Sequence, residues 1–430
     1  MKGNNFQLII LVVFIVAGLF GILVFAGLIP IGQPVKTGPV GVVTLWGTEK
    51  TSSIGKAITI FNNANSNVSL KYVQKNPATF DQDLLEALAT GSGPDLFILS
   101  DDLIIHYKNK ISIFPYPSYP LANFKNTFSS AGEVYLTPDG VLALPISVDP
   151  LIMYYNRAVL DANNIATPPS YWDDLQNIVP SLTKKDSSGK LISSAVALGQ
   201  FSNINNAKDI IATLFMQAGS SIAENKGGVF YSTLDKVDNK IDPGSILSFY
   251  TQFTDPLNQF YSWNRSLQNS RDAFSSQALD FYFGYASELP YLTSKNPNLN
   301  FYVAPIPQIK NSNFKVTFGR TQGIAVSSAS KNKNSAFMVA SLLASGDFAQ
   351  QFSDALLVAP ARRDLLAKKP TDAYNPIFYS SALYSKSWPD PSSEKTDAIF
   401  SGMIDNALSN NLTPKGAVLD ASSKLDFILK

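Results

Sequence analysis

The sequence predicts an α/β protein with two lobes, preceded by one apolar N-terminal helix. Three observations carry this prediction. Short β-branched strand patterns alternate with amphipathic helical patterns from residue 40 onward. The chain has 430 residues, more than one ordinary hydrophobic core contains. Residues 6–29 form an apolar run in which Gln7 is the one strongly polar member.

The N-terminal run, taken first, has the length of a membrane span. As a helix, residues 6–29 would extend about 36 Å at about 1.5 Å per residue, enough to cross a bilayer. A cleavable signal peptide has a shorter apolar region, so we expect an uncleaved transmembrane anchor, with cleavage after residues 24–26 as the alternative. Lys2 favours a cytoplasmic N-terminus. The Pro- and Gly-rich residues 30–39 would be the linker to an extracytoplasmic domain, which makes this a single-pass plasma-membrane protein.

The next expected region is a parallel sheet. Predicted strands and helices alternate three times within about sixty residues, and Thr79 has the residue type of a helix N-cap. The predicted strands are 40–46, 68–73 and 95–99, and the predicted helices are 52–63 and 79–88.

The alternation resumes after residue 140. Two strands, 141–145 and 151–155, are expected with 146–150 as their connection. The remaining predicted helices are 168–182, 207–218, 245–253, 271–277 and 334–343, and the remaining strands are 278–283, 300–303 and 323–327.

Polar and aromatic residues follow the first and third predicted strands. Ligands of open α/β sheets bind beyond the carboxyl ends of strands, so these residues are candidate ligand contacts. Trp46 fits the core equally well, whereas Glu49 falls in the loop after it. Asp101 and Asp102 could bind a ligand or cap the following helix.

Composition excludes several classes of chemistry. Lys plus Arg number 34 and Asp plus Glu number 33, which gives no basic footprint for nucleic acid. The absence of cysteine excludes disulfides, thiolate catalysis, Cys-ligated zinc and a lipid-modified Cys anchor. His106 is the single histidine, and no nucleophile elbow or Walker loop is present. We therefore expect no catalytic residue, cofactor, metal or nucleic-acid partner.

Five blocks of sequence resemble the family of extracellular solute-binding proteins that includes maltose-binding protein. They occur in the family's order from residue 40 to about 367. The chain departs from the pattern at Arg320, where the family has glycine, and in lacking the lipoprotein Cys. The blocks are LLEALATGSGPDLFIL (84–99), GVLALPISVDPLIMYYNRAVL (140–160), PPSYWDDLQNIVPSLT (168–183), the helix and strand from 271 that end in FYVAPIP (301–307), and TFGRTQGIAV (317–326) with the helix 330–343.

The resemblance implies a periplasmic-binding-protein-like (Venus flytrap) fold, whose lobes close over a ligand by bending at a hinge. The chain would cross between lobes near residues 147–149, 301–304 and 354–359. The expected lobes are 40–148 plus 303–354, and 149–302 plus 355–430.

The resemblance also implies further ligand contacts. Asp149 lies where a hinge acid occurs in maltose-binding protein, although it could instead form an ion pair between the lobes. Tyr155 alternates with Tyr154, so at most one of the two faces the cleft. The other implied contacts are Phe201, Asn203, Tyr285, Arg320 and Trp388.

The function that the resemblance implies is capture of a small ligand for the permease of an ABC importer. We expect a carbohydrate ligand, a neutral mono- or oligosaccharide. Two alternatives stay open at this point. A membrane-anchored glycosidase would need only a pair of carboxylates, and a ligand-sensing receptor could have the same fold.

Overall fold

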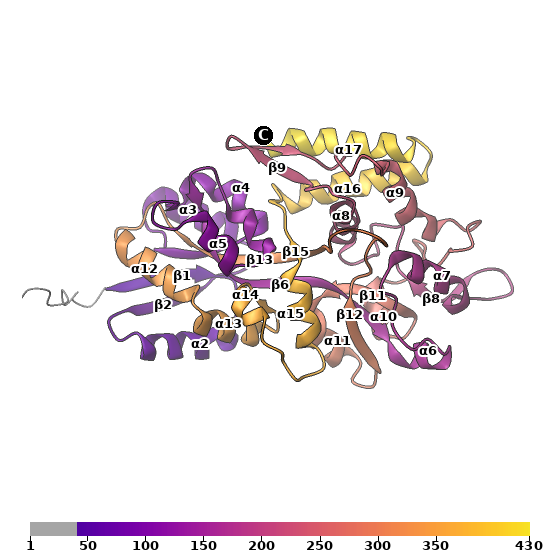
Figure 1. The fold of residues 1–430 in the computed structure, drawn as a ribbon, viewed down its shortest axis with the longest axis horizontal. Coiled ribbons are helices and arrows are strands. Elements are labelled where there is room, and N and C mark those ends of the chain that lie inside the picture. The colour runs from indigo at the N-terminus through magenta and orange to yellow at the C-terminus, as the bar shows by residue number, and fades with distance from the viewer. Residues whose placement is uncertain (1–40) are drawn as a thin grey trace, which may run out of the picture.

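The computed structural model describes residues 41–430. Two α/β lobes lie side by side along the long axis of the molecule, each with helices packed around strands (Figure 1). The prediction of a two-lobed α/β fold is confirmed. The expected anchor at 6–29 and the linker at 30–39 lie outside the described residues. Within 41–430, no helix is long and apolar enough to cross a membrane.

The first lobe is built on β1 (Val42–Gly47), which pairs in parallel with β2 (Ser69–Gln74) and β3 (Leu96–Ser100). Parallel neighbours need a crossover connection, and α2 (Thr51–Ala64) and α3 (Phe80–Thr90) provide it. The strands and helices predicted here match the observed ones to within two residues. Shorter elements complete the lobe: η1 (Asp101–Leu103), α4 (Ile104–Tyr107), η2 (Lys108–Lys110), β4 (Phe114–Pro115), α5 (Leu121–Thr127), η3 (Ser130–Tyr135), β5 (Gly140–Val141), α12 (Lys333–Leu343) and α13 (Gly346–Leu356).

Two long antiparallel strands join the lobes: β6 (Ala143–Asn156) and β13 (Thr317–Val326). A third, short strand, β14 (Ala359–Pro360), pairs with Ser147 and Val148 in the middle of β6. Because β6 and β13 belong to both lobes, the strands form one continuous sheet with the order β2-β1-β3-β13-β6-β11-β8-β7. These strands are therefore the structural candidates for a hinge.

The prediction of two strands around residues 146–150 is wrong, because β6 continues through that stretch. Pro145 and Pro150 suggested breaks, since proline lacks the N–H that a ladder uses. In the structure Pro145 lies opposite Gly323, beside a register irregularity at which β6 has one extra residue, Ile146. β13 also begins six residues before the predicted start at 323, which makes Arg320 and Gln322 strand residues.

The second lobe is built on β11 (Leu279–Tyr285), which pairs antiparallel with β6 and parallel with β8 (Leu191–Val196). Its other elements are α6 (Arg157–Ala162), α7 (Trp172–Leu182), β7 (Lys184–Lys185), α8 (Ala207–Gln217), β9 (Ala223–Lys226), β10 (Val229–Ser232), α9 (Pro243–Thr251), η4 (Gln252–Thr254), α10 (Ser270–Ser275), η5 (Ala286–Glu288), α11 (Leu289–Lys295) and β12 (Phe301–Pro305).

The strand β12 does not make the crossing that was expected near residues 301–304. It pairs with residues 152–156 of β6, at the second-lobe end of that strand. β13 is the strand that runs beside β6 from residue 150 back to residue 143. The chain therefore returns to the first lobe along β13, after β12.

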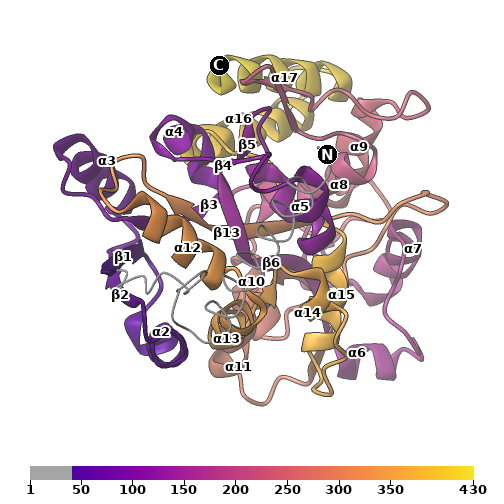
Figure 2. The same ribbon diagram turned by 60° about the vertical axis from the view of Figure 1, so that its left-hand side comes forward.

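The C-terminal elements cover the seam and the second lobe. α14 and α15 lie near the middle of the molecule beside β6 (Figure 2). α16 and α17 pack on each other and on α9 in the second lobe (Figure 1). Their bounds are α14 (Arg363–Leu366), α15 (Asn375–Leu383), β15 (Ser385–Lys386), α16 (Ser393–Leu408) and α17 (Pro414–Leu429).

Candidate ligand-binding cleft

A cavity of ≈ 660 Å³ lies between the lobes, above the crossing strands. Its size is that of a small-molecule site. Its lining comes from the loop after β1, the end of β3, the middle of β6 and β13, the start of α8 and the segment 388–397. Seven of the eleven predicted ligand contacts line it: Glu49, Asp101, Asp102, Asp149, Phe201, Arg320 and Trp388.

The first-lobe wall carries carboxylates whose hydrogen-bond partners are neutral. Gln322 Nε2 donates to Glu49 Oε1 at 2.8 Å, and Ser147 Oγ donates to Gln322 Oε1 at 3.1 Å. Asp101 accepts a hydrogen bond from the Ser387 hydroxyl. Burial, and then the charge of neighbouring Asp102, raise the pKa of Asp101 to about 7.

The acid Asp149 lies at the centre of the floor, on β6. It is opposite Arg320 in the β6–β13 register. Ser287 binds it twice, with the backbone N–H on Oδ1 at 3.0 Å and the hydroxyl on Oδ2 at 2.5 Å. Burial raises the pKa of Asp149 to about 6, although these hydrogen bonds act in the opposite direction.

The cation Arg320 lies against the second-lobe wall. Its Nη2 is 3.2 Å from Asp209 Oδ2, and its guanidinium carbon is 3.9 Å from the ring centroid of Tyr285. The Tyr285 hydroxyl donates to the same Asp209 oxygen at 2.5 Å. Burial alone would lower the pKa of Arg320. Tyr285 and the nearby carboxylates outweigh this effect and raise the pKa above its usual value, so the guanidinium stays charged.

A second ion cluster surrounds Lys208 at the start of α8. Its ammonium is 2.8 Å from Asp390 Oδ2 and 2.7 Å from Asp397 Oδ1, and it donates to Thr396 Oγ1 at 3.0 Å. Burial opposes the charge of Lys208, but these carboxylates outweigh it and raise its pKa. The acids of this wall are therefore paired with cations.

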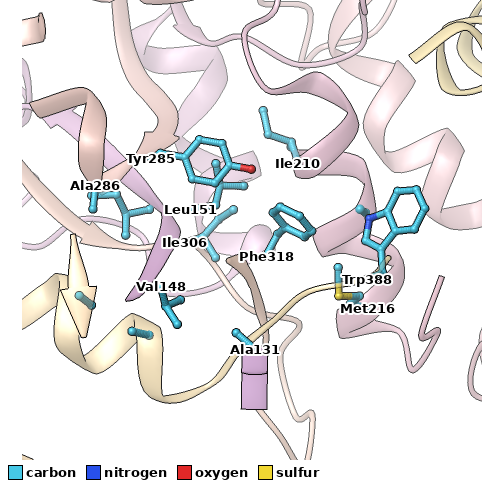
Figure 3. Packing of buried hydrophobic residues seen from close by; sticks show 14 of the residues in the cluster. Ala131, Val148, Leu151, Ile210, Met216, Tyr285, Ala286, Ile306, Phe318 and Trp388 are labelled. Carbon is cyan, nitrogen blue, oxygen red and sulfur yellow. The ribbon is translucent and has the colours of Figure 1, made fainter. Parts of the chain in front are cut away.

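Aromatic side chains support the cavity from below more than they line it. Phe318 and Trp388 line it but are only 4% and 2% exposed, and Tyr285 packs edge-on against Phe318 (Figure 3). Phe201 is half-buried. The surface offered to a ligand is mainly polar.

Two predicted contacts, Trp46 and Tyr155, lie outside the cavity lining. The buried side chains of β1 alternate, and Trp46 falls on the other face, where the Lys75 ammonium is 3.7 Å from its ring centroid. Tyr155 is buried, with its ring stacked on Tyr302 of β12. Both residues support the sheet.

The predicted contacts Asn203 and Tyr285 are also engaged elsewhere. Asn203 holds a loop, because its Nδ2 donates to the carbonyls of Asn264 and Leu267 and its Oδ1 accepts from Trp263 Nε1. Tyr285 lies behind Arg320 and Asp209, so it positions groups of the lining without being one.

Sequence reasoning missed several residues of the lining. Asp209 is a buried acid in α8, a helix whose other side chains are almost all apolar or buried, and that contrast was an available signal. Gln322 was missed because its strand was expected to begin one residue later. Lys208, Asp390 and Asp397 meet only through the tertiary fold, and the sequence carries no local signal for that meeting.

Two lobes that enclose a polar cavity at their hinge define a ligand-binding protein. The chain belongs to the family of bacterial extracellular solute-binding proteins, whose model matches residues 47–363. A Brucella abortus (strain 2308) relative, described only as a binding protein, is 23% identical over 372 residues, 81% of this chain and 83% of the relative.

Solved structures show the same fold at low sequence identity. A cyclo/maltodextrin-binding protein complexed with maltotetraose has a TM-score of 0.72 and 15% identity, over 91% of this chain and 97% of its own. The cyclic alpha-maltosyl-1,6-maltose binding protein of Arthrobacter globiformis has a TM-score of 0.74 and 14% identity, over 91% and 100%. The sugar-binding protein MalE of Xanthomonas citri has a TM-score of 0.73 and 15% identity, over 90% and 97%.

Proposed function

We propose that this protein captures a mono- or oligosaccharide between its lobes and delivers it to the permease of an ABC importer. The observation that carries the proposal is the polar lining of the ≈ 660 Å³ cavity, which comes from both lobes and from the strands that join them. Sugar hydroxyls both donate and accept hydrogen bonds. Carboxylates accept from them, a guanidinium donates to them, and an amide can do both. The sugar-binding structures named above share this architecture.

The proposed contacts are the predicted residues that line the cavity. Asp149 and Arg320 would contact the ligand from the floor, and Glu49, Asp101 and Asp102 from the first lobe. Phe201 would contribute apolar contact from the second lobe, and Trp388, which is almost fully buried, would contribute the edge that reaches the cavity. A ligand that touches both walls stabilises the closed arrangement, and a permease can then recognise the loaded form by its shape.

The lobe boundaries are part of the proposal. The division into 40–148 plus 303–354 and 149–302 plus 355–430 places its breaks close to β6 and β14. The pairing of β13 with β6 favours a second boundary near residue 320 instead of 303. Bending would then occur where Val148 lies between Thr321 and Ala359.

The proposed location is the outer face of the plasma membrane, with residues 6–29 as a single-pass anchor. The family of extracellular solute-binding proteins supports an extracytoplasmic domain. An alkaline carbonate wash of isolated membranes tests the anchor, since an integral protein stays in the pellet. Release of the intact chain into the wash would contradict it.

We further propose that the bound saccharide leaves unchanged. The family consists of solute-binding proteins, which supports capture without catalysis. Incubation with labelled oligosaccharides, followed by chromatography, should return the input compound. Hydrolysis that disappears when cavity carboxylates are replaced would select a glycosidase.

A thermal-shift screen tests the proposed ligand class. The full-length chain, kept in mild detergent because residues 6–29 are apolar, is mixed with sugars, amino acids and phosphate esters. A saturating ligand at about 100 times its Kd stabilises the fold by about 2.7 kcal/mol, which raises Tm measurably. We expect saccharides to raise Tm. Stabilisation by amino acids or phosphate esters alone would contradict the proposal.

A further inference from the structure

The lining of the cleft is strongly acidic, although the chain as a whole is nearly neutral. The chain has a formal charge of +1. The cavity is lined by seven carboxylates and two cations, a formal excess of five negative charges when every carboxylate is ionised. The carboxylates are Glu49, Asp101, Asp102, Asp149, Asp209, Asp390 and Asp397, and the cations are Lys208 and Arg320.

Both cations of the lining already have partners. Lys208 contacts Asp390 and Asp397, and Arg320 contacts Asp209. The other four carboxylates accept hydrogen bonds from neutral groups: Glu49 from Gln322, Asp101 from Ser387, Asp102 from Ser100 and Asp149 from Ser287. Within the described residues, the carboxylates without an ion pair therefore lie on the first-lobe wall and on the floor, although the charge of Arg320 acts on Asp101 and Asp149 from a distance.

Asp101 is the most constrained of these four groups. It is 8% exposed and lines the cavity, and Ser387 binds one of its oxygens. No other residue within 41–430 donates a hydrogen bond to its second oxygen. A carboxylate buried without a charged partner is costly, and a cation from the ligand would remove that cost.

We propose that the ligand is a saccharide that carries a protonated amino group, held by Asp101 and Asp102 with Glu49 beside them. This inference rests on the proposed function and narrows its ligand class, from the neutral sugar expected initially to a cationic one. A neutral sugar could also donate hydroxyls to carboxylates. It would leave the excess negative charge in a cavity that loses water on closure, where uncompensated charge is least tolerated.

Pairs of sugars that differ in whether they carry protonated amino groups test this inference. The full-length chain in mild detergent is titrated by calorimetry with glucosamine and glucose, galactosamine and galactose, and the β-1,4 dimer and trimer of glucosamine with their N-acetylated counterparts. At least one amino sugar should bind about 10-fold or more tightly than its neutral partner. Raising NaCl from about 0.05 to 0.5 M should weaken only the charged member.

Variants assign the effect to the first-lobe wall. Asp101→Asn and Asp102→Asn keep side-chain size, and each should bring the ratio between charged and neutral members towards one. Glu49→Gln is the second test if either variant folds poorly. Asp173→Asn removes an exposed acid at the start of α7, outside the cavity lining, and should leave the ratio unchanged.

The possible results separate this inference from the proposed function. Neutral sugars that bind as tightly as their amino partners would overturn the cationic ligand and leave sugar capture intact. Failure of every amino sugar to bind would also overturn it. Binding of spermidine or arginine, with no saccharide bound, would contradict both.

Discussion

The two walls of the cleft hold their carboxylates in different ways. On the second-lobe wall, Asp209 and Asp390 are paired with Arg320 and Lys208 through ionic contacts of 3.2 and 2.8 Å. On the first-lobe wall, Asp101 has a serine hydroxyl as its partner. We call the second-lobe wall complete, because its carboxylates have cationic partners without a ligand. We call the first-lobe wall incomplete, because its carboxylates have only neutral hydrogen-bond partners. Under the proposed function, this difference makes the first-lobe wall the candidate for ligand recognition and gives the second-lobe wall structural support.

The largest expected effect follows removal of an acid from the complete wall. Asp209→Ala leaves the Tyr285 hydroxyl and Arg320 without their shared partner at a site where Asp209 is 5% exposed. The Tyr285 hydroxyl is buried, but the Arg320 side chain is 53% exposed, so we expect the free energy of unfolding to fall by about 2–4 kcal/mol in urea titrations. The matched control is Asp405→Ala, which removes the 51% exposed partner of Arg265 and should cost less than about 1 kcal/mol. Equal losses in the two variants would break the comparison.

Because of the incomplete wall, we expect the free energy of unfolding to fall as pH rises. The pKa of Asp101 is about 7 in the folded protein and about 3.9 in an unfolded chain. Between these values the folded state holds a proton that the unfolded state has released. Asp101 therefore stabilises the fold fully below pH 4, and this contribution is lost as pH rises through 7. Its size is on the order of 2–4 kcal/mol.

Asp149 acts in the same direction, between about pH 4 and its folded pKa of about 6. Unfolding in urea from pH 4.5 to 8 measures the combined slope. Asp101→Asn should flatten it, because asparagine does not titrate. A variant with the slope of the parent protein would show that Asp101 is not held as a buried, unpaired acid.

A smaller effect is expected for the amide that holds the first-lobe wall in place. Gln322→Ala removes the hydrogen bonds to Glu49 and Ser147. The expected loss is about 1–2 kcal/mol of unfolding free energy, with weaker ligand binding. Gln82→Ala removes an exposed amide bonded to Glu86 and should change stability by no more than about 0.5 kcal/mol. If both variants behaved alike, Gln322 would have no special part in the wall.

The smallest expected effect concerns a contact between the rims of the two lobes. Lys108 donates to the carbonyl of Gly228 at 3.1 Å, and its ammonium is 5.2 Å from the Phe230 ring centroid. Lys108→Ala should speed ligand dissociation by about 2–5-fold, because the contact favours the closed arrangement. Lys110→Ala is the control, since its ring contact, Tyr107, lies in the same lobe. Equal dissociation rates in the parent protein and the Lys108 variant would contradict a role for this contact.

Local patterns predicted most of the fold and part of the site. The apolar β-branched strands and the helices between them were found to within two residues in the first lobe, because their burial follows from local periodicity. The acids after β1 and β3 were found because strand ends define the edge where ligands bind. Pairing across the hinge was not visible, since Pro145 and Pro150 suggested breaks. The structure places Pro145 beside an irregularity of β6 and Pro150 in regular register opposite Gly319. Trp46, which fitted the core equally well, lies outside the cavity lining, on the other face of β1.

The ion cluster of the second-lobe wall could not be predicted from local sequence patterns. Lys208 and Asp390 are separated by 182 residues and meet only when α8 and the segment before α16 come together. Nothing in either local sequence specifies the other residue. Their meeting makes the wall complete, so the contrast between the walls could be recognised only from the structure.

The central claim, that the lobes close over a ligand, can be tested by one distance. The chain has no cysteine, so Leu85→Cys and Leu419→Cys place two spin labels at exposed sites on α3 and α17 without background. Pulsed electron paramagnetic resonance then measures the distance between the two labels with and without a saccharide that raises Tm. We expect the ligand to narrow the distribution and shorten its mean. An unchanged distribution with the ligand bound would show that capture does not involve closure of the two lobes.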